Sequence, residues 1–162
     1  MSPEDYERVV AEIVRGICEG APELNDIVLG QGRANRLLGA SGYKHQIDVS
    51  LSSAAKTYLI ECKRWESKIG VEEIMTLAAR STDIAQAHEG NIAQAILAST
   101  KGATRGAIIL ARFFNIQLEV VHSAHVFGFR IGKQVRVGVA DGFRIVDRVI
   151  AKVIQNDTSS ES

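Results

Sequence analysis

Three charged residues, Asp48, Glu61 and Lys63, lie in two short apolar stretches and carry the chemistry that the sequence suggests. The stretches cover residues 46–52 and 57–63, and polar and apolar residues alternate in each as they do in a β-strand. Side chains two residues apart on a strand share a face, so Glu61 and Lys63 are expected roughly 6–7 Å apart. Two carboxylates beside a lysine can hold a hard divalent cation such as Mg²⁺ and aim a water molecule.

The position of Asp48 decides whether this site can form. Asp48 shares its predicted strand face with Gln46, Ser50 and Ser52, opposite Ile47, Val49 and Leu51. A short connection favours a hairpin between the two stretches, and a hairpin places Asp48 across from Glu61. The alternative is a cross-strand ion pair on a solvated sheet face, worth a few tenths of a kcal/mol.

The bulk composition sets limits on the class of protein. The chain has 162 residues, 46% of them hydrophobic and 23% charged, which suits one globular domain, predicted over residues 1–155 with a disordered polar tail at 156–162. With 19 basic and 19 acidic residues, nucleic-acid binding would need a local basic patch. Cys18 and Cys62 have no pairing pattern, no apolar run reaches membrane-spanning length, and the N-terminus lacks a signal sequence. A cytoplasmic protein with no membrane contact is expected.

The elements around the two stretches predict an α/β fold with a central mixed sheet flanked by helices. Ser2 can cap a helix that begins at Pro3 and ends near Gly20, and a second helix is predicted over 71–87. The inner face of this second helix is predicted to carry Val71, Ile74, Met75, Ala78 and Ala79. The remaining expectations are short strands at 26–29 and 36–38, a parallel crossover from strand 92–98 through helix 104–114 to strand 116–121, a hairpin of 126–131 with 134–139, and a closing helix within 145–154.

Several local motifs accompany this order of elements. Gly39-x-x-Gly42 precedes Asp48, and Glu61-Cys62-Lys63 is a Glu-x-Lys motif followed by Arg64-Trp65. The first helix carries Tyr6-Glu7 before the apolar pair Val9-Val10, and small residues recur at four-residue spacing at 107 and 111. Over about residues 5–121 the chain resembles the Mrr-type catalytic domains of the PD-(D/E)xK, or restriction-endonuclease-like, nuclease superfamily. It departs from the nominal Pro-Asp of that superfamily, because Ile47 precedes Asp48.

This resemblance implies a restriction-endonuclease-like fold, to which the hairpin and helix predicted after residue 122 are an extra C-terminal addition. It implies a Mg²⁺-dependent endonuclease, with Mn²⁺ able to substitute, that hydrolyses DNA phosphodiester bonds in restriction or defence. Asp48, Glu61 and the backbone carbonyl of Cys62 would bind the metal ion. Lys63 would orient the attacking water or stabilise charge on the phosphate. Glu7 would reach the site from the first helix, or it could be an ordinary exposed helix glutamate.

The remaining candidate residues have weaker sequence support. Lys44, Arg64, Lys101 and Arg105 could contact DNA phosphates, the last two at the start of a helix where backbone amides favour anions, or they could be ordinary surface cations. Gln46 could support the site from the face of Asp48, or serve as a polar surface residue.

Two other functions compete with the nuclease. One is a nucleic-acid-binding or interaction module on the same fold that does not cut, which the complete Asp/Glu/Lys set disfavours. The other is a nucleotide-binding loop at Gly30-Gln-Gly32, which lacks the third glycine and the following helix, so a turn between strands is preferred.

A homodimer with DNA as the partner is also expected. One Asp/Glu/Lys set hydrolyses one strand, so cutting both strands of a duplex needs two chains, most simply related by a two-fold axis. Val126, Phe127 and Phe129 of the predicted C-terminal hairpin are candidates for the contact between subunits. The alternative is that this hairpin only covers one end of the sheet.

Overall fold

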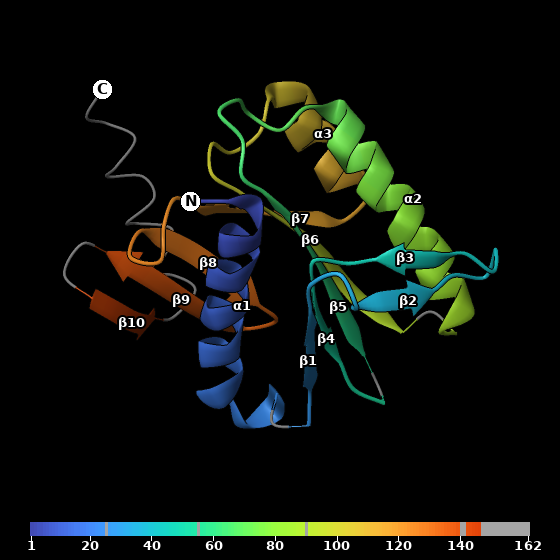
Figure 1. Ribbon diagram of the computed structural model, residues 1–162, viewed down its shortest axis with the longest axis horizontal. Helices are drawn as coiled ribbons and strands as arrows, with labels where there is room; N and C mark the ends of the chain where they lie inside the picture. Colours follow the sequence, from blue (N-terminus) through green and yellow to red (C-terminus); the bar gives the residue numbers. More distant parts are fainter. Residues whose placement is uncertain (25, 55, 90, 140–141, 147–162) are drawn as a thin grey trace.

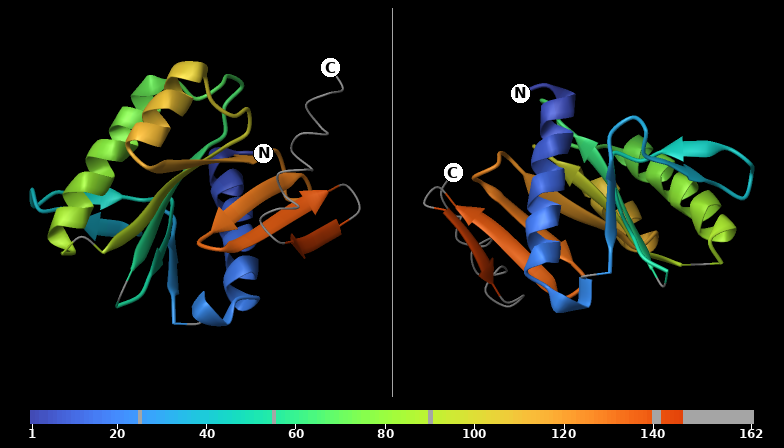
Figure 2. Two further views of the ribbon diagram at one scale, coloured as in Figure 1. Left: turned by 180° about the vertical axis from the view of Figure 1, so that it is seen from behind. Right: turned by 60° about the horizontal axis from the view of Figure 1, so that its bottom comes forward.

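The computed structural model describes residues 1–24, 26–54, 56–89, 91–139 and 142–146. A mixed sheet has the strand order β1-β4-β5-β6-β7-β8-β9-β10, with β2 and β3 forming a separate two-stranded sheet (Figure 1). Helix α1 covers one face of the large sheet, and α2 and α3 cover the other (Figure 2). The helical segments are α1 (Pro3–Glu19), the 3-10 turn η1 (Pro22–Leu24), α2 (Val71–Ala87) and α3 (Arg105–Phe113). The strands are β1 (Val28–Gln31), β2 (Arg36–Leu38), β3 (Lys44–Gln46), β4 (Val49–Ser52), β5 (Thr57–Lys63), β6 (Ile92–Ser99), β7 (Ile116–Val121), β8 (Phe127–Ile131), β9 (Gln134–Val139) and β10 (Gly142–Val146).

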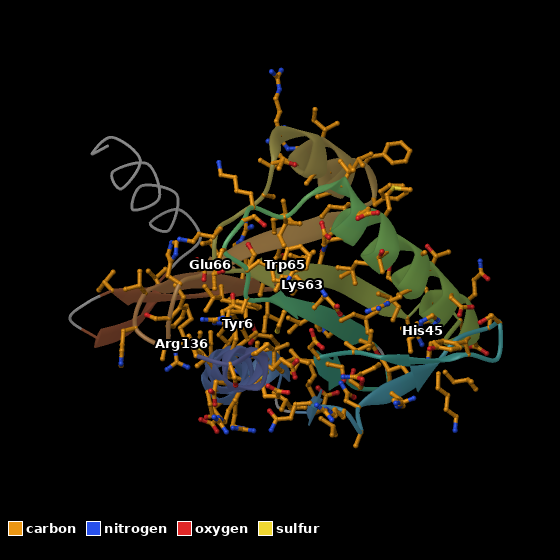
Figure 3. The ribbon with its side chains drawn as sticks, turned by 45° about the horizontal axis from the view of Figure 1, so that its top comes forward. Tyr6, His45, Lys63, Trp65, Glu66 and Arg136 are labelled. Atoms are coloured by element: carbon orange, nitrogen blue, oxygen red, sulfur yellow. The ribbon has the colours of Figure 1, made fainter. Side chains whose placement is uncertain are left out.

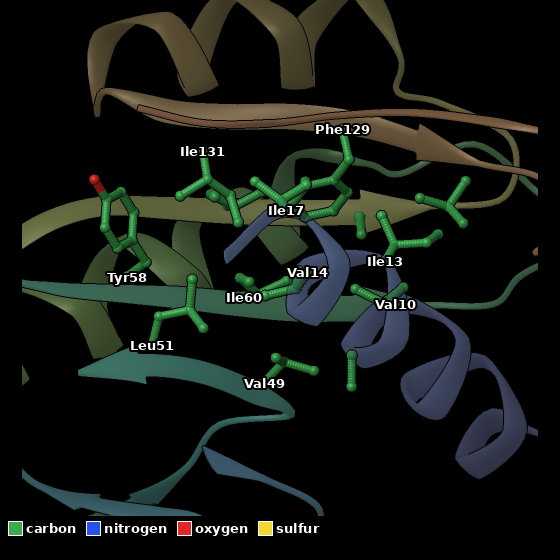
Figure 4. Close-up of a cluster of buried hydrophobic side chains, with 14 of the residues drawn as sticks. Val10, Ile13, Val14, Ile17, Val49, Leu51, Tyr58, Ile60, Phe129 and Ile131 are labelled. Atoms are coloured by element: carbon green, nitrogen blue, oxygen red, sulfur yellow. The ribbon is translucent and has the colours of Figure 1, made fainter. Parts of the chain in front are cut away.

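Helix α1 begins where the sequence predicts. The hydroxyl of Ser2 accepts a hydrogen bond from the Asp5 amide at 3.1 Å, and the Asp5 carboxylate accepts one from the Ser2 amide at 3.1 Å. This reciprocal capping satisfies two of the amides that a helix start leaves free. The apolar stripe of α1 packs across the sheet against β4, β5 and β8 and is nearly sealed from solvent. It includes Tyr6, and Figure 4 shows Val10, Ile13, Val14 and Ile17 of this stripe.

The predicted crossover in the middle of the chain is confirmed. Strands β5, β6 and β7 are parallel, and α3 connects β6 to β7. Thr104 caps α3 by accepting from the Ala107 amide at 3.3 Å, and Asn115 ends it with a left-handed φ of 55°. The carboxyl ends of β5 and β6 therefore meet at one edge of the sheet, where Lys63 lies beside Ser99.

Helix α2 has the predicted bounds but a different inner face. Its buried residues are Ile74, Leu77, Ala78 and Ile84, whereas Val71 and Met75 are 47% and 48% exposed and Ala79 is also exposed. The prediction for Val71, Met75 and Ala79 was therefore wrong. Turning Leu77 and Ile84 toward the sheet buries more apolar area than turning Ala79 inward, which sets the rotation of the helix.

The C-terminal strands form a meander on one edge of the sheet. The predicted hairpin of β8 with β9 is confirmed, with Gly132 in the left-handed region at φ 57° in its turn. Residues 142–146 form β10, antiparallel to β9, so Ile145 and Val146 belong to a strand and not to the start of the closing helix. Both are β-branched, a side-chain type that favours strands. The rest of that predicted helix, the end of the predicted 1–155 domain and the 156–162 tail lie outside the described residues.

The segment around Asp48 also differs from a single continuous strand. Residues 44–46 form β3 and pair with β2, while β4 begins only at Val49 and pairs with β5. The short strand at 36–38 is confirmed as β2, and the strand predicted at 26–29 is shifted to Val28–Gln31. Ile47 packs with Leu59 and Ile84 on the α2 side, so it does not share a face with Val49 as predicted. The chain thus bends at Asp48, between the two sheets. No helix in the described segments is long and apolar enough to cross a membrane.

Candidate active site

Asp48 is fixed at the bend that joins β3 to β4. Val49 pairs with Ile60 in the antiparallel ladder, so Asp48 comes next in register opposite Glu61. One carboxylate oxygen of Asp48 accepts a hydrogen bond from the Cys62 amide at 2.8 Å. The pKa of Asp48 is raised to about 6, chiefly by burial and then by the neighbouring charge of Glu61. The hydrogen bond from the Cys62 amide lowers this pKa by less than Glu61 raises it. The predicted meeting of Asp48 with Glu61 is therefore present in the structure.

The loop before Asp48 depends on close packing at Gly30 and Asn35. The Asn35 side chain donates to the Ile47 carbonyl at 2.8 Å and accepts from the Ser50 hydroxyl at 3.1 Å. A Cβ on Gly30 would lie 2.5 Å from the Asn35 side-chain oxygen, so a larger residue there would displace Asn35 from these bonds. β2 follows this loop instead of a long helix, which agrees with a turn between strands.

Glu61 is buried, at 6% exposure, on the α2 side of β5 and is surrounded by cations. The Lys63 Nζ lies 2.8 Å from Glu61 Oε1, and the Arg80 Nη1 lies 3.2 Å and 3.3 Å from the two carboxylate oxygens. Burying a carboxylate is costly unless opposite charge and hydrogen bonds accompany it, and the two cations meet that need. No pattern in the sequence distinguishes Arg80, because it occupies an ordinary polar position of α2.

Lys63 lies between Glu61 and Trp65. Its ammonium group is 5.8 Å from the centre of the Trp65 ring, within the range of a cation–π contact (Figure 3). The hydroxyl of Thr100 donates to the Trp65 carbonyl at 2.7 Å and accepts from the Trp65 amide at 3.2 Å. These bonds tie the segment after β5 to the segment after β6 and limit the positions that Lys63 can take.

Cys62 turns its side chain away from the site and its backbone toward it. The thiol packs in the core beneath α1, where burial raises its pKa well above the ordinary value. The Lys63 carbonyl accepts from the Thr100 amide on the β6 side. Because carbonyl directions alternate along a strand, the Cys62 carbonyl points to the β4 side, where Asp48 lies. The backbone carbonyl predicted as a third metal ligand therefore points to the side of the strand on which Asp48 lies.

Glu7 reaches toward the site from α1. It is half-buried, and its pKa is raised first by burial and then by the charges of Glu4 and Glu61. Its own charge in turn raises the pKa of Asp48. Three carboxyl groups therefore lie within electrostatic range of one another, although the hydrogen bonds recorded for the described residues do not include one to the Glu7 side chain.

A pocket of about 360 Å³ opens beside the two carboxylates, between the β2–β3 hairpin and α2. Asp48, Glu61 and Arg80 line its inner part, and the side facing the hairpin is lined by Arg36, Tyr43, Lys44, His45 and Gln46. The structure thus brings the predicted Gln46 and Lys44 to the site. Arg64, Lys101 and Arg105 do not line the pocket: they follow β5, follow β6 and begin α3, respectively.

The hairpin is held in place by Asp83 of α2. Asp83 accepts from the Ser41 hydroxyl at 2.6 Å and the Ser41 amide at 2.8 Å, and its Oδ2 lies 2.7 Å from the His45 Nε2. These partners, Ser41 first, lower the pKa of Asp83 to about 2. A Cβ on Gly39 would lie 1.9 Å from the Asp83 carboxylate, which explains the first glycine of the Gly-x-x-Gly motif. Figure 3 shows His45 beside α2, away from Lys63.

The donor set fits a hard divalent cation, although the side chains alone do not complete it. Within the described residues, no group of three or more His, Cys, Asp or Glu side chains is placed to hold a metal ion. The two carboxylates of Asp48 and Glu61 and the carbonyl of Cys62 are all oxygen donors, which Mg²⁺ prefers, and Mg²⁺ keeps several of its waters.

A mixed sheet with Asp48 at a strand bend, Glu61 and Lys63 on the next strand, and helices on both faces defines a restriction-endonuclease-like domain of the PD-(D/E)xK type. The chain belongs to the Mrr-type restriction endonuclease family, whose catalytic-domain model matches residues 1–126. Its fold is similar to the crystal structure of AF1548, a protein of unknown function, with a TM-score of 0.53 and 19% sequence identity. That similarity covers 69% of this chain and 56% of AF1548. No curated protein matches the chain in sequence.

Proposed function

We propose that this chain is a Mg²⁺-dependent endonuclease that hydrolyses DNA phosphodiester bonds and acts in restriction or defence. The observation that carries the proposal is that Asp48 and Glu61 line one pocket while Lys63 contacts Glu61 from the same strand. A solvated cross-strand ion pair does not account for a glutamate that is only 6% exposed and contacts two cations.

Asp48, Glu61 and the Cys62 carbonyl would hold the metal ion, with Mn²⁺ able to replace Mg²⁺. The bound ion supplies Lewis-acid polarisation of the phosphate and makes water a better nucleophile near neutral pH. Asp48 must be ionised to serve, and its raised pKa means that a cation entering the site releases a proton from part of the molecules.

The residues of the chain itself position the reaction. Lys63 orients the attacking water or stabilises the charge that builds on the phosphate. Its ammonium group is already fixed by Glu61 and Trp65, so little side-chain entropy remains to be lost. Glu7 adds a third carboxyl group from α1, where it can accept a hydrogen bond from a water molecule in the site.

Candidate DNA contacts lie on two sides of the site. Lys44 lines the pocket from β3. Arg64, Lys101 and Arg105 lie at the ends of β5 and β6 and at the start of α3. Since Lys63 is also at the end of β5, a strand that enters the site can meet cations on both sides of the scissile phosphate.

A plasmid-nicking assay tests the function directly. Supercoiled DNA is incubated with the protein in Mg²⁺, in Mn²⁺ and in EDTA, and a structured RNA is run in parallel. We expect conversion to the nicked or linear form only with a divalent ion, and only on DNA. Intact plasmid under all conditions, from protein that binds DNA, would instead support the module that does not cut.

We also propose that the active form is a homodimer, because one chain carries one Asp/Glu/Lys set and a duplex has two strands. The C-terminal hairpin does not offer the predicted contact: Phe127 and Phe129 are 4% and 0% exposed and pack into the core beneath α1. Val126, at 44% exposure, is the one of the three that remains accessible. Light scattering at micromolar protein, free and on DNA, measures the state, and a monomer in both would exclude the dimer.

A further inference from the structure

The pocket beside Glu61 has a basic wall that the cleavage reaction itself does not use. Arg80 of α2 and Arg36 and Lys44 of the β2–β3 hairpin line the same cavity as Asp48 and Glu61. We propose that this cavity binds one phosphate of the nucleic-acid strand, adjacent to the phosphate that is cleaved, through Arg80, Arg36 and Lys44. That the neighbouring phosphate is cleaved rests on the proposed nuclease function, whereas the binding of a phosphate in the cavity does not.

Arg80 is oriented by Glu61, but this contact engages only part of its guanidinium group. Only its Nη1 contacts Glu61, and the hydrogen bonds recorded among the described residues include no other for this guanidinium. A guanidinium has five N–H donors in a planar fork, so the remaining donors can bind a second anion while Nη1 stays on Glu61. Arg80 can therefore link the carboxylate that would hold the metal to a phosphate in the cavity.

Arg36 and Lys44 supply the opposite wall. They lie on paired strands, where Arg36 is opposite Gln46 and Lys44 is opposite Leu38. Both side chains are exposed, and within the described residues neither forms an ion pair. Unlike Arg80, they have no buried carboxylate to neutralise, so a structural need for their charge is not apparent from their contacts.

The two walls of the cavity, the β2–β3 hairpin and α2, are joined by hydrogen bonds. The bonds from Ser41 and His45 to Asp83 anchor the hairpin to α2, the helix that also carries Arg80. A preformed cavity of about 360 Å³ is at the small end of ligand sites, so it suits one phosphate with its sugar and excludes a duplex. The lining contains three cations, Arg36, Lys44 and Arg80, and two carboxylates, so positive charge is in excess, and a divalent ion on the carboxylates would increase that excess.

The test measures DNA binding without cleavage. Binding of a fluorescent duplex is followed by anisotropy in EDTA and in Ca²⁺, over a series of salt concentrations, for Arg36→Gln, Lys44→Gln and Arg80→Gln. Lys133→Gln, an exposed lysine in the β8–β9 turn, is the matched charge control. Each pocket variant should bind roughly tenfold more weakly and lose about one unit of the slope of log affinity against log salt, while the control stays near wild type.

Wild-type affinity and slope in both Arg36→Gln and Lys44→Gln would overturn the proposal, even if Arg80→Gln failed to fold.

Two further experiments identify the source of the phosphate. They measure binding to a closed circular duplex, and to short linear duplexes that carry a 5′-phosphate or a 5′-hydroxyl. A pocket effect on the circle assigns an internal phosphate, and an effect confined to 5′-phosphorylated ends assigns a terminal one. If the variants nick DNA with Mg²⁺ as the wild type does and bind DNA as the wild type does, the nuclease function stands and the phosphate subsite is excluded. If the variants bind DNA more weakly but the wild type does not nick, the subsite stands and the nuclease function is excluded.

Discussion

Glu61 and Glu119 are both buried in the central sheet and both contact an arginine. They differ in their other partners and in whether they border a cavity. Glu61 is 6% exposed and Glu119 is 3% exposed. Glu61 contacts both Lys63 and Arg80, faces Asp48 and borders a cavity. Glu119 accepts from Arg130 at 2.7 Å and from the Gln117 side chain at 2.8 Å, and it does not line that cavity.

The surroundings of Glu119 give it a structural role. Strands β7 and β8 pair at only two positions, Val120 with Gly128 and Val121 with Phe127. Beyond these two positions, side chains hold β7 and β8 together. Arg130 donates to Glu119, and the Gln117 side chain donates to the Arg130 carbonyl at 2.8 Å. A buried carboxylate is thus not by itself a site; a second carboxylate, a spare cation and open volume distinguish Glu61.

The largest expected effect is on metal binding. Asp48→Ala or Glu61→Ala removes one of the two carboxylate ligands, so Mn²⁺ binding and cleavage should both be lost. Glu119→Gln serves as the matched change of another buried carboxylate and should bind Mn²⁺ as the wild type does. Calorimetric titration of Mn²⁺ checks this, and equal affinity in all three variants would contradict the assignment.

The next effect separates catalysis from metal binding. Lys63→Ala should lower the cleavage rate by roughly 10²–10³-fold, because it removes one fixed charge at the reacting phosphate. Its Mn²⁺ titration should stay close to that of the wild type, and it should still unfold cooperatively because Arg80 remains in contact with Glu61. The measurement is single-turnover nicking, and a rate within a factor of two of the wild type would remove Lys63 from the reaction.

A smaller effect concerns stability at Glu119. Burial raises the pKa of Glu119 to about 7, although Arg130 opposes the shift. In the unfolded chain the pKa of a glutamate is about 4.3. The folded state therefore holds the proton more tightly, so this contribution to stability is complete below about pH 4 and is lost as pH rises through about 7. In Glu119→Gln this decline should be absent, a difference of roughly 2–3 kcal/mol between pH 5 and 8. Urea unfolding at several pH values measures it; parallel curves for both proteins would refute the raised pKa.

Local sequence rules predicted the elements whose neighbours in sequence determine them. The capped start of α1, the parallel β6–α3–β7 crossover and the β8–β9 hairpin follow from capping, periodicity and turn residues. Alternation along β5 likewise placed Glu61 and Lys63 on one face. For these features the determining residues lie within a few positions of one another.

The errors come from contacts between distant segments. Alternation continues through residues 46–52, so periodicity could not show that Asn35 and Gly32 bend the chain at Asp48. The face of α2 depended on which residues meet β6, a matter of packing rather than of helix period. Arg80 and Asp83 carry ordinary helix charges, and only the fold brings them to Glu61 and to the β2–β3 hairpin.

The packing of α1 has a consequence for the order in which the chain can fold. The Tyr6 hydroxyl bonds to the Val121 carbonyl, 115 residues away, and the apolar stripe of α1 is completed by Phe129 and Ile131. When only the first hundred residues have been made, β4 and β5 are present, but the part of the α1 stripe that packs against β7 and β8 has no partner yet. Such distant contacts slow folding, since loop closure must come before they can stabilise the chain. In pulsed hydrogen exchange, the amides of α1 should gain full protection together with those of β8, and protection of α1 long before β8 would contradict this order.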